Sequence, residues 1–328
     1  MTKGTPRIRK MLYVIGLLIL AGLTALALGP RPSSDTTVEF DEATLPDDLD
    51  AYLAASEGQF EDLRPGNERQ IVWAYPASRA RTPLAIVYIH GFSASPGELR
   101  PLPDLVAKDL GANLYYARLK GHGRSGDAML DGSVHGWVND FAEAVAIGRR
   151  LGERVIVIAT STGASLTTWA ATQPELMRDV AGLVQFSPNF GLQATGSTLL
   201  GMPWARQMVQ LIIGDRRSFE TRTPLHAQYW TSDYPSIALL PMASLVKLAD
   251  AADPGSITIP SLFVYSPLDQ VIRPDLVAAK AAKWGAPARI IEATDDDDLS
   301  HHVIAGDALS PSTTDRLAKE TATWIAGL

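Results

Sequence analysis

Short runs of apolar residues alternate with stretches of helical pattern along most of this chain. The two clearest runs, at 84–89 (LAIVYI) and 154–159 (RVIVIA), are apolar at nearly every position. Such runs are typical of strands that are buried on both faces, and strands that alternate with helices favour parallel pairing. The sequence therefore predicts an α/β protein with a mostly parallel sheet flanked by helices.

The other predicted elements continue this alternation. Further strands are predicted over residues 69–75, 113–117, 180–186, 261–265 and 289–292. Helices are predicted over residues 137–151, 162–172, 275–283 and 313–325. Another helix is expected to start near Ser95, because Ser95 and Glu98 match a capping box and Pro96 suits the first helical position.

Residues from about 190 to 256 interrupt the alternation. This stretch is rich in Pro, Trp and Met and has little strand signal. We expect a helical cap that is inserted between two strands of the sheet. Its predicted place is over the carboxyl edge of the sheet, where open α/β sheets bind ligands.

The N-terminal segment, residues 1–30, differs from the rest in composition. Residues 11–29 carry no charge, and as a helix they would span about 28 Å, close to the hydrocarbon thickness of a bilayer. Arg7, Arg9 and Lys10 precede this run, which predicts a cytoplasmic N-terminus and an exported domain. The length of the apolar run favours a permanent signal anchor.

A cleaved signal peptide is the alternative, with Ala25 and Ala27 as the small-residue pair before the cleavage site. In that case the domain is secreted. With an anchor it stays on the membrane outside the cytoplasm, on the periplasmic side if the cell is bacterial. Residues 31–65, with Pro, Ser and Asp throughout, are interpreted as a linker, and residues 66–328 as the folded domain.

Charge and cysteine content exclude several classes of partner and site. The formal net charge is −7, which disfavours binding to a nucleic-acid backbone. The chain has no cysteine, so disulfides, cysteine zinc sites, iron–sulfur clusters and a thiol nucleophile are excluded. The pattern of residues predicts no cofactor and no catalytic metal, and it carries no signal for an oligomeric state.

The sharpest motif is Ala159-Thr160-Ser161-Thr162-Gly163, between a predicted buried strand and a predicted helix. A serine on a tight strand-to-helix turn exposes its hydroxyl, and the turn leaves room only for small residues two positions away. The motif differs from G-x-S-x-G by one methyl group, at Ala159. Ser161 is therefore the candidate nucleophile. The alternative is a serine that only caps the following helix.

Four further motifs accompany this turn and suggest a family. In chain order the five are His90-Gly91-Phe92, the glycine loop Lys120–Gly123, the Ser161 turn, Asp269 and His302. On these motifs, residues 70–328 resemble the α/β-hydrolase superfamily. They are most similar to bacterial carboxylesterases and the monoglyceride-lipase group, which carry a helical cap. The resemblance implies the α/β-hydrolase fold and the chain order nucleophile, acid, histidine.

The resemblance also implies roles for individual residues. The glycine after strand 84–89 lets the backbone turn sharply, and the backbone N–H groups of Phe92 and Thr162 would form an oxyanion hole. Asp269 follows a predicted strand at the position of the triad acid. Some relatives carry the acid one strand earlier. There this chain has Ser187-Pro188-Asn189, without a carboxylate, which favours Asp269.

The chain has six histidines, and only His301 and His302 follow Asp269. His302 precedes an apolar Val-Ile pair, as the catalytic histidine does in the resembling carboxylesterases, so His302 is the predicted base. His90 and His122 are interpreted as structural. The acidic run Asp295–Asp298 has the oxygen ligands that calcium prefers, but we favour a solvated acidic loop.

The resemblance predicts a serine hydrolase that cleaves carboxylic esters through an acyl-enzyme and needs no cofactor. Its substrate would be a small-molecule ester or a lipid-like ester. An apolar cap suits an acyl chain, although packing of the cap onto the sheet explains its composition equally well. The cap residues concerned are Trp204, Met208, Leu211, Ile212, Ile213, Trp230, Leu239 and Leu240.

Two other interpretations remain open at this point. An aminopeptidase or an acyltransferase would use the same triad. A non-catalytic, membrane-tethered binding protein on the same scaffold would keep the fold without the chemistry.

Overall fold

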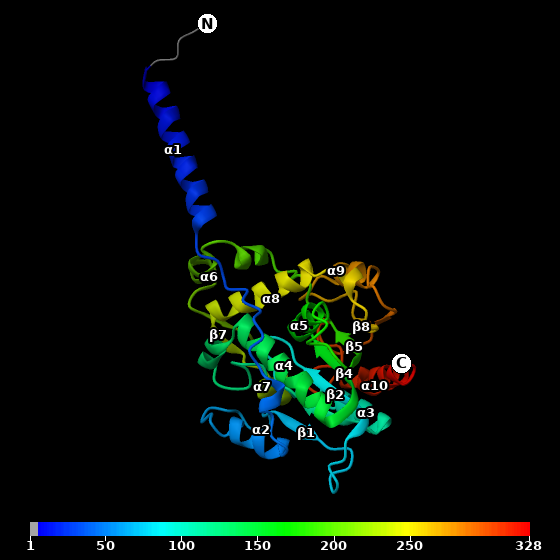
Figure 1. Ribbon diagram of the computed structural model, residues 1–328. Coiled ribbons are helices and arrows are strands. Elements are labelled where there is room, and N and C mark those ends of the chain that lie inside the picture. Colours follow the sequence, from blue (N-terminus) through cyan, green and yellow to red (C-terminus); the bar gives the residue numbers. More distant parts are fainter. Residues whose placement is uncertain (1–5) are drawn as a thin grey trace.

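The computed structural model describes residues 6–328, with a seven-stranded sheet at the centre of the domain (Figure 1). The strand order is β1-β3-β2-β4-β5-β8-β9. β1 pairs antiparallel with β3, and the other neighbours are parallel. The strands are β1 (Gln70–Val72), β2 (Thr82–Ile89), β3 (Asn113–Tyr116), β4 (Gly152–Thr160), β5 (Val180–Phe186), β8 (Ser261–Tyr265) and β9 (Ala288–Glu292). The predicted mostly parallel sheet is confirmed.

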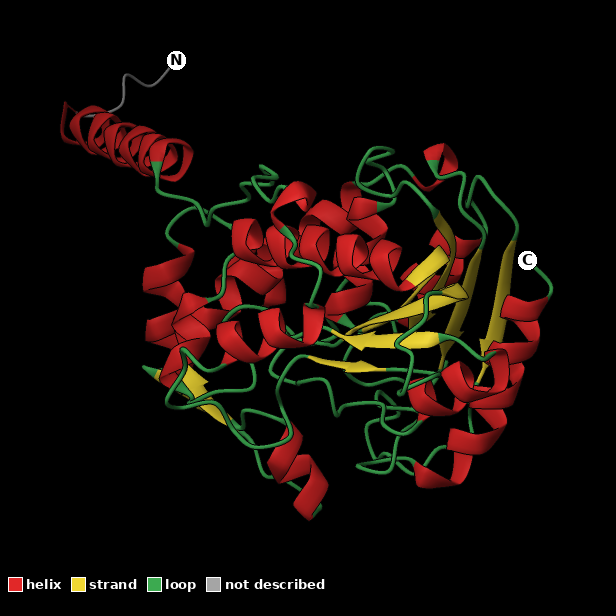
Figure 2. Cartoon of the chain, turned by 60° about the horizontal axis from the view of Figure 1, so that its bottom comes forward, coloured by secondary structure: helices red, strands yellow, loops and turns green. Residues whose placement is uncertain are grey.

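Helices cover both faces of the sheet (Figure 2). Alternate residues of β2 enter two separate cores: Ala85, Val87 and Ile89 pack on one face, and Ile86 and Tyr88 on the other. This two-residue period is that of a strand buried on both sides, which explains the unbroken apolar run in the sequence. The first face carries α4 (Val134–Leu151), α5 (Thr162–Ala170) and α9 (Pro274–Ala281), and the second carries α3 (Leu102–Leu110) and α10 (Pro311–Ala326).

The helix expected from Ser95 was wrong in its start. α3 begins at Leu102, and residues 95–101 form turns. A helix that began at Ser95 would hold Pro101 in its interior, where proline lacks the N–H for the helical hydrogen bond and its ring clashes with the preceding turn. Glu98 is therefore not a capping residue.

The cap segment lies between β5 and β8. Its helices are α6 (Ala205–Ile213), α7 (Pro224–Tyr229) and α8 (Leu239–Ala251), with short 3₁₀ turns at Ser197–Gly201, Ser236–Ala238 and Pro254–Ser256. The cap also contains a two-stranded antiparallel ladder of β6 (Arg216–Ser218) and β7 (Asp233–Pro235), which the sequence analysis missed. α8 packs against α5, so the last cap helix also belongs to one of the two cores.

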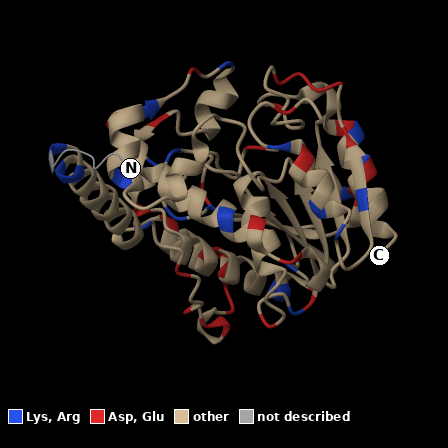
Figure 3. Ribbon diagram, turned by 90° about the horizontal axis from the view of Figure 1, so that it is seen from above, with Lys and Arg blue, Asp and Glu red and all other residues tan. Residues whose placement is uncertain are grey.

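The N-terminal helix α1 (Pro6–Leu28) projects away from the domain (Figure 1). Its residues Arg7–Leu28 are long and apolar enough to cross a membrane, and none of that window is buried against the domain. In Figure 3 nearly the whole helix is tan, with its basic residues at one end. Residues 1–5 of the predicted segment 1–30 lie outside the described residues.

Residues 31–65 differ from the expected linker because they pack on the domain. A 3₁₀ turn at Glu42–Thr44 precedes α2 (Leu49–Glu57), which Asp48 caps at its N-terminus. Leu49 and Leu53 are buried, since residues four apart lie on the same helix face. The buried Glu57 carboxylate accepts hydrogen bonds from Arg69 at 2.7 Å and from Arg118 at 2.8 Å. The polar composition of residues 31–65 therefore gave no indication that Leu49 and Leu53 are buried or that Glu57 forms buried ion pairs.

This packing leads to a prediction about truncations. Deleting residues 1–30 removes a segment whose end contacts the exposed Trp204, so we expect the thermal unfolding midpoint to stay near that of the full-length protein. Deleting residues 1–58 also removes α2 and leaves Arg69 and Arg118 without Glu57, at an expected cost of at least about 3 kcal/mol. Circular dichroism measures both. Unfolding of the shorter deletion would contradict the prediction.

Candidate active site

The backbone turn at Ser161 joins β4 to α5. Ser161 has φ 51° and ψ −116°, a conformation that a residue with a Cβ rarely adopts. Its N–H donates to Phe186 O on the neighbouring strand at 2.9 Å. A Cβ on Gly163 would lie 2.4 Å from His90 O, so only glycine fits there. These contacts hold the serine hydroxyl above the carboxyl edge of the sheet in a strained turn.

Ser161, His302 and Asp269 lie in a continuous hydrogen-bonded chain. His302 Nε2 is 3.0 Å from Ser161 Oγ, and His302 Nδ1 is 2.7 Å from Asp269 Oδ2. The other oxygen of Asp269 accepts the N–H groups of Val271 at 2.7 Å and Ile272 at 2.9 Å. The carboxylate is thus oriented by the turn after β8. The structure brings together the three side chains that the sequence singled out.

The ionisation of His302 reflects two opposing effects. Burial disfavours the imidazolium and lowers the pKa of His302, whereas the charge of Asp269 and its hydrogen bond raise it. The second effect prevails, so the pKa of His302 lies above its ordinary value. An imidazole in this environment can accept a proton from a neighbouring hydroxyl, and the carboxylate beside it stabilises the resulting charge.

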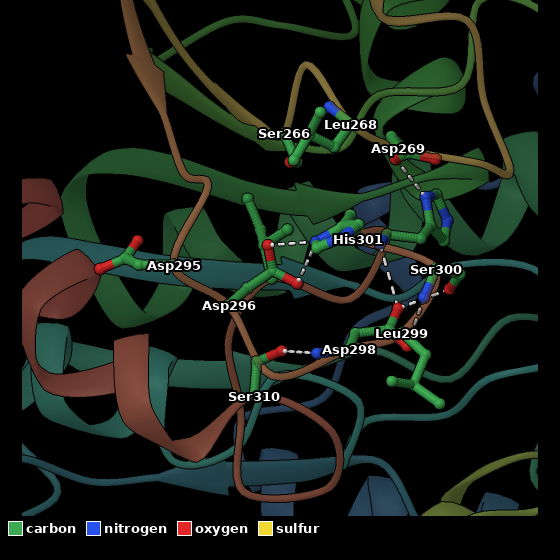
Figure 4. Close-up of polar contacts among 12 residues, drawn as sticks. Ser266, Leu268, Asp269, Asp295, Asp296, Asp298, Leu299, Ser300, His301 and Ser310 are labelled. Carbon is green, nitrogen blue, oxygen red and sulfur yellow. Dashed lines mark hydrogen bonds and ion pairs between the residues drawn. The ribbon is translucent and has the colours of Figure 1, made fainter.

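The adjacent histidine points elsewhere. His301 has φ 53°, which turns the chain sharply between the two rings. Its Nδ1 lies 3.0 Å from Asp296 Oδ2, whose side chain is fully buried (Figure 4). His301 is therefore engaged by Asp296, whereas His302 contacts Ser161 and Asp269.

The two residues whose backbone amides are the predicted oxyanion-hole donors lie at the same cavity as Ser161. Phe92 and Thr162 both line it, and neither N–H donates a hydrogen bond to another of residues 6–328. His90 Nε2 accepts the Leu119 N–H at 3.0 Å, so His90 Nδ1 carries the proton and donates to Gly91 O at 2.8 Å. His90 is fully buried and acts on the backbone, consistent with the structural role expected for it.

The cavity above Ser161 has a volume of about 840 Å³. Cap side chains form its apolar wall, and the polar cap residues Arg217, Glu220 and Arg222 also line it. Three of the eight apolar cap residues named from the sequence do not line the cavity. Leu211 and Trp204 are exposed, and Leu240 packs in the core. The other five line the cavity: Met208, Ile212, Ile213, Trp230 and Leu239.

Comparison with known proteins identifies the family. Residues 86–318 match the sequence model of the alpha/beta hydrolase family. The chain belongs to this family. A thermostable monoacylglycerol lipase of Bacillus sp. (strain H-257) is 25% identical over 201 residues, which cover 61% of this chain and 76% of that lipase.

Solved structures of several lipolytic enzymes share the fold. A metagenome-derived lipolytic enzyme aligns with a TM-score of 0.65 at 18% identity, covering 81% of this chain and 100% of its own. A monoacylglycerol lipase of Paleococcus ferrophilus gives a TM-score of 0.56 at 13% identity, with coverages of 79% and 98%. A soluble variant of the Saccharomyces cerevisiae monoglyceride lipase, in complex with a substrate analog, gives 0.58 at 10% identity, with coverages of 79% and 90%.

In this alpha/beta hydrolase, the acidic run Asp295–Asp298 is solvated only in part, because Asp295 and Asp297 are exposed and Asp298 is buried. Asp298 is 2% exposed, and its Oδ2 accepts the N–H groups of His302 at 3.0 Å and Val303 at 3.1 Å. Its other oxygen pairs with Arg222 of the cap. Asp298 therefore anchors the loop that carries His302 and ties that loop to the cap.

The other three carboxylates of the run are also engaged by the protein. Asp295 pairs with Arg316, Asp296 with His301, and Asp297 accepts the Ser312 N–H. Within residues 6–328, no group of three or more acidic or histidine side chains is arranged to hold a metal ion.

Sequence reasoning missed Glu98 as a residue of this site. Glu98 is 2% exposed and lines the cavity with Ser161. Its Oε2 accepts the Gly91 N–H at 2.7 Å and the Tyr88 hydroxyl at 3.0 Å. Pro101 argues against a helix that starts at Ser95 and so against a capping role for Glu98, but no motif in the sequence places Glu98 beside Gly91.

Proposed function

We propose that this alpha/beta hydrolase cleaves carboxylic esters through an acyl-enzyme on Ser161. The observation that carries the proposal is the chain from Ser161 Oγ through His302 to Asp269, with distances of 3.0 and 2.7 Å. A hydroxyl with a base in hydrogen-bond reach, oriented by a carboxylate, is the arrangement that activates a serine nucleophile. The lipase and esterase names of its relatives support ester bonds as the target.

The proposed reaction has two stages. Ser161 Oγ attacks the ester carbonyl carbon while His302 Nε2 takes its proton, and the tetrahedral oxyanion accepts hydrogen bonds from the Phe92 and Thr162 amides. His302 then gives the proton to the leaving alcohol as the carbon–oxygen bond breaks. A water molecule, deprotonated by His302, attacks the acyl-enzyme and releases the acid. Asp269 holds the imidazole in the required tautomer throughout.

The cavity wall supports an ester with an acyl chain as the substrate class. Met208, Ile212 and Leu239 offer an apolar surface beside Ser161. An acyl chain gains about 0.8 kcal/mol for each methylene that such a surface removes from water. The monoacylglycerol lipases among the relatives act on substrates of this kind by their names, which supports a lipid-like ester here.

We also propose that α1 anchors the protein in a membrane, with the hydrolase domain outside the cytoplasm. The apolar length of α1 and its basic N-terminal end support this orientation. Trp204 Nε1 donates to Ala25 O at 2.9 Å, and the cap helix that follows, α6, exposes Leu211 (87%). Cleavage after Ala27 and secretion is the alternative, and the apparent mass of the protein in a membrane fraction distinguishes the two.

A substrate panel with full-length protein in detergent tests the proposed activity. We expect turnover of p-nitrophenyl esters and labelling of Ser161 by a fluorophosphonate. Matching p-nitroanilides test an aminopeptidase, and transfer of the acyl group to an added alcohol tests an acyltransferase. A protein that takes no label and turns over no ester would be a binding protein on this scaffold.

The rate is also expected to depend on pH through His302. Protonated His302 cannot accept the Ser161 proton, so kcat/KM rises as pH increases through the pKa of this group. Because Asp269 raises the pKa of His302, the midpoint is expected above about 6.5, the value of an ordinary histidine. Initial rates at subsaturating ester from pH 5 to 9 measure this. A flat profile would contradict a serine–histidine mechanism.

A further inference from the structure

A buried carboxyl lies behind the predicted oxyanion hole and has no part in the mechanism above. Glu98 Oε2 accepts the Gly91 N–H at 2.7 Å, and the Gly91 carbonyl accepts the His90 Nδ1 proton at 2.8 Å. Both ends of Gly91 are therefore held. Since C=O and N–H point in opposite directions across a trans peptide, fixing the Gly91 carbonyl also fixes the direction of the Phe92 N–H.

The same carboxyl reaches the nucleophile turn through Tyr88. The Tyr88 hydroxyl is 3.0 Å from Glu98 Oε2 and 3.2 Å from Thr160 Oγ1. Thr160 directly precedes Ser161, and all three side chains are buried. A Cβ placed on Gly91 would lie 2.9 Å from Glu98 Oε1 and 3.1 Å from Ser161 Cβ, so the carboxyl and the serine approach the glycine together.

We propose that Glu98 is a positioning residue of the active site, which fixes the Phe92 amide relative to Ser161 through Gly91 and Tyr88. This inference rests on the proposed esterase function. The oxyanion is absent from the bound ester and forms only in the transition state and the tetrahedral intermediate, so a misplaced amide lowers kcat rather than raising KM.

The position of Glu98 also gives it an electrostatic effect on His302. The charged groups around His302 are Asp269 after β8, Asp298 on its own loop with its partner Arg222 of the cap, and Glu98 behind the Gly91 turn. The charge of Glu98 raises the pKa of His302. Burial raises the pKa of Glu98 itself to about 7, so its charge changes in the pH range of the reaction.

Three variants of the full-length protein test the proposal on a soluble short-chain ester. Glu98→Ala removes the acceptor, and we expect kcat to fall about 100-fold with KM changed by less than about threefold. Glu98→Gln keeps an acceptor oxygen but no charge. We expect its kcat at high pH to stay within about threefold of wild type. The acid limb, which is the part of the profile where kcat/KM rises with pH, should move to lower pH. The matched control is Glu57→Gln, a change at the buried last residue of α2, which should leave both kcat and the acid limb unchanged.

The outcomes separate this inference from the proposed function. A folded Glu98→Ala variant with wild-type kcat, or an acid limb of Glu98→Gln that coincides with wild type, would overturn the positioning role. If Glu98→Ala does not fold, the acid limb of Glu98→Gln decides alone, because a merely structural glutamate would leave it in place. Full activity of a Ser161→Ala variant would instead reject the esterase mechanism itself.

Discussion

The Ser161→Ala variant is expected to lose at least about 10⁴-fold in kcat on a short-chain p-nitrophenyl ester, because no other group can form the acyl-enzyme. Loss of a triad serine leaves only the contribution of substrate binding and the oxyanion hole. Folding should be unaffected, since the change removes one oxygen from a 7% exposed side chain. Stopped-flow or steady-state hydrolysis measures the rate, and circular dichroism measures the fold.

A matched control separates loss of the nucleophile from a general effect of truncating a buried serine. Ser244 on α8 is 6% exposed, close to the exposure of Ser161, and it does not line the cavity. Ser244→Ala should keep kcat within about threefold of wild type. Ester turnover by Ser161→Ala at more than about a tenth of the wild-type rate would mean that another residue carries the acyl group.

The second large effect concerns the two neighbouring histidines. His302→Ala should lower kcat by at least about 10⁴-fold, because Ser161 then has no base within reach. His301→Ala should keep at least about a tenth of the wild-type kcat. It should nevertheless reduce stability by about 1–3 kcal/mol, because the buried Asp296 carboxylate loses its partner at 3.0 Å.

Paired measurements on one protein preparation distinguish these effects. Hydrolysis rates report the base, and urea unfolding midpoints report the Asp296 contact. The reverse ranking of the two variants, with His301→Ala inactive and His302→Ala active, would move the base by one residue. It would also mean that the loop rearranges when substrate binds.

The strands of the sheet were predicted more accurately than the turns between them. The apolar runs at 180–186 and 261–265 match β5 and β8 residue for residue. A strand buried on both faces is apolar at nearly every position, with only Gln185 and Ser261 polar in these two strands, and that property is local to the strand and visible in its own residues. The start of α3 was missed because the capping-box pattern at Ser95 is also local, but Pro101 overrode it.

The packing of the N-terminal region illustrates a different limit. The polar composition of residues 31–65 suggested a linker, yet Leu49 and Leu53 are buried and Glu57 pairs with Arg69 and Arg118. Those partners lie elsewhere in the sequence. Whether a short helix docks depends on what surface the distant chain offers, and composition does not report it.

The sequence alone was sufficient for the fold class and for the choice of Ser161, Asp269 and His302 as candidates, because motif spacing and chain order are linear properties. The tertiary structure decided how the two adjacent histidines are used, since the His302 ring contacts Ser161 and the His301 ring contacts Asp296. It also decided that Asp298 holds the histidine loop and that Glu98 lies behind the Gly91 turn. These roles arise from contacts between segments far apart in the chain, or within turns that carry no sequence motif. A hydrogen bond requires its two partners to lie about 3 Å apart, and only the folded backbone determines that distance.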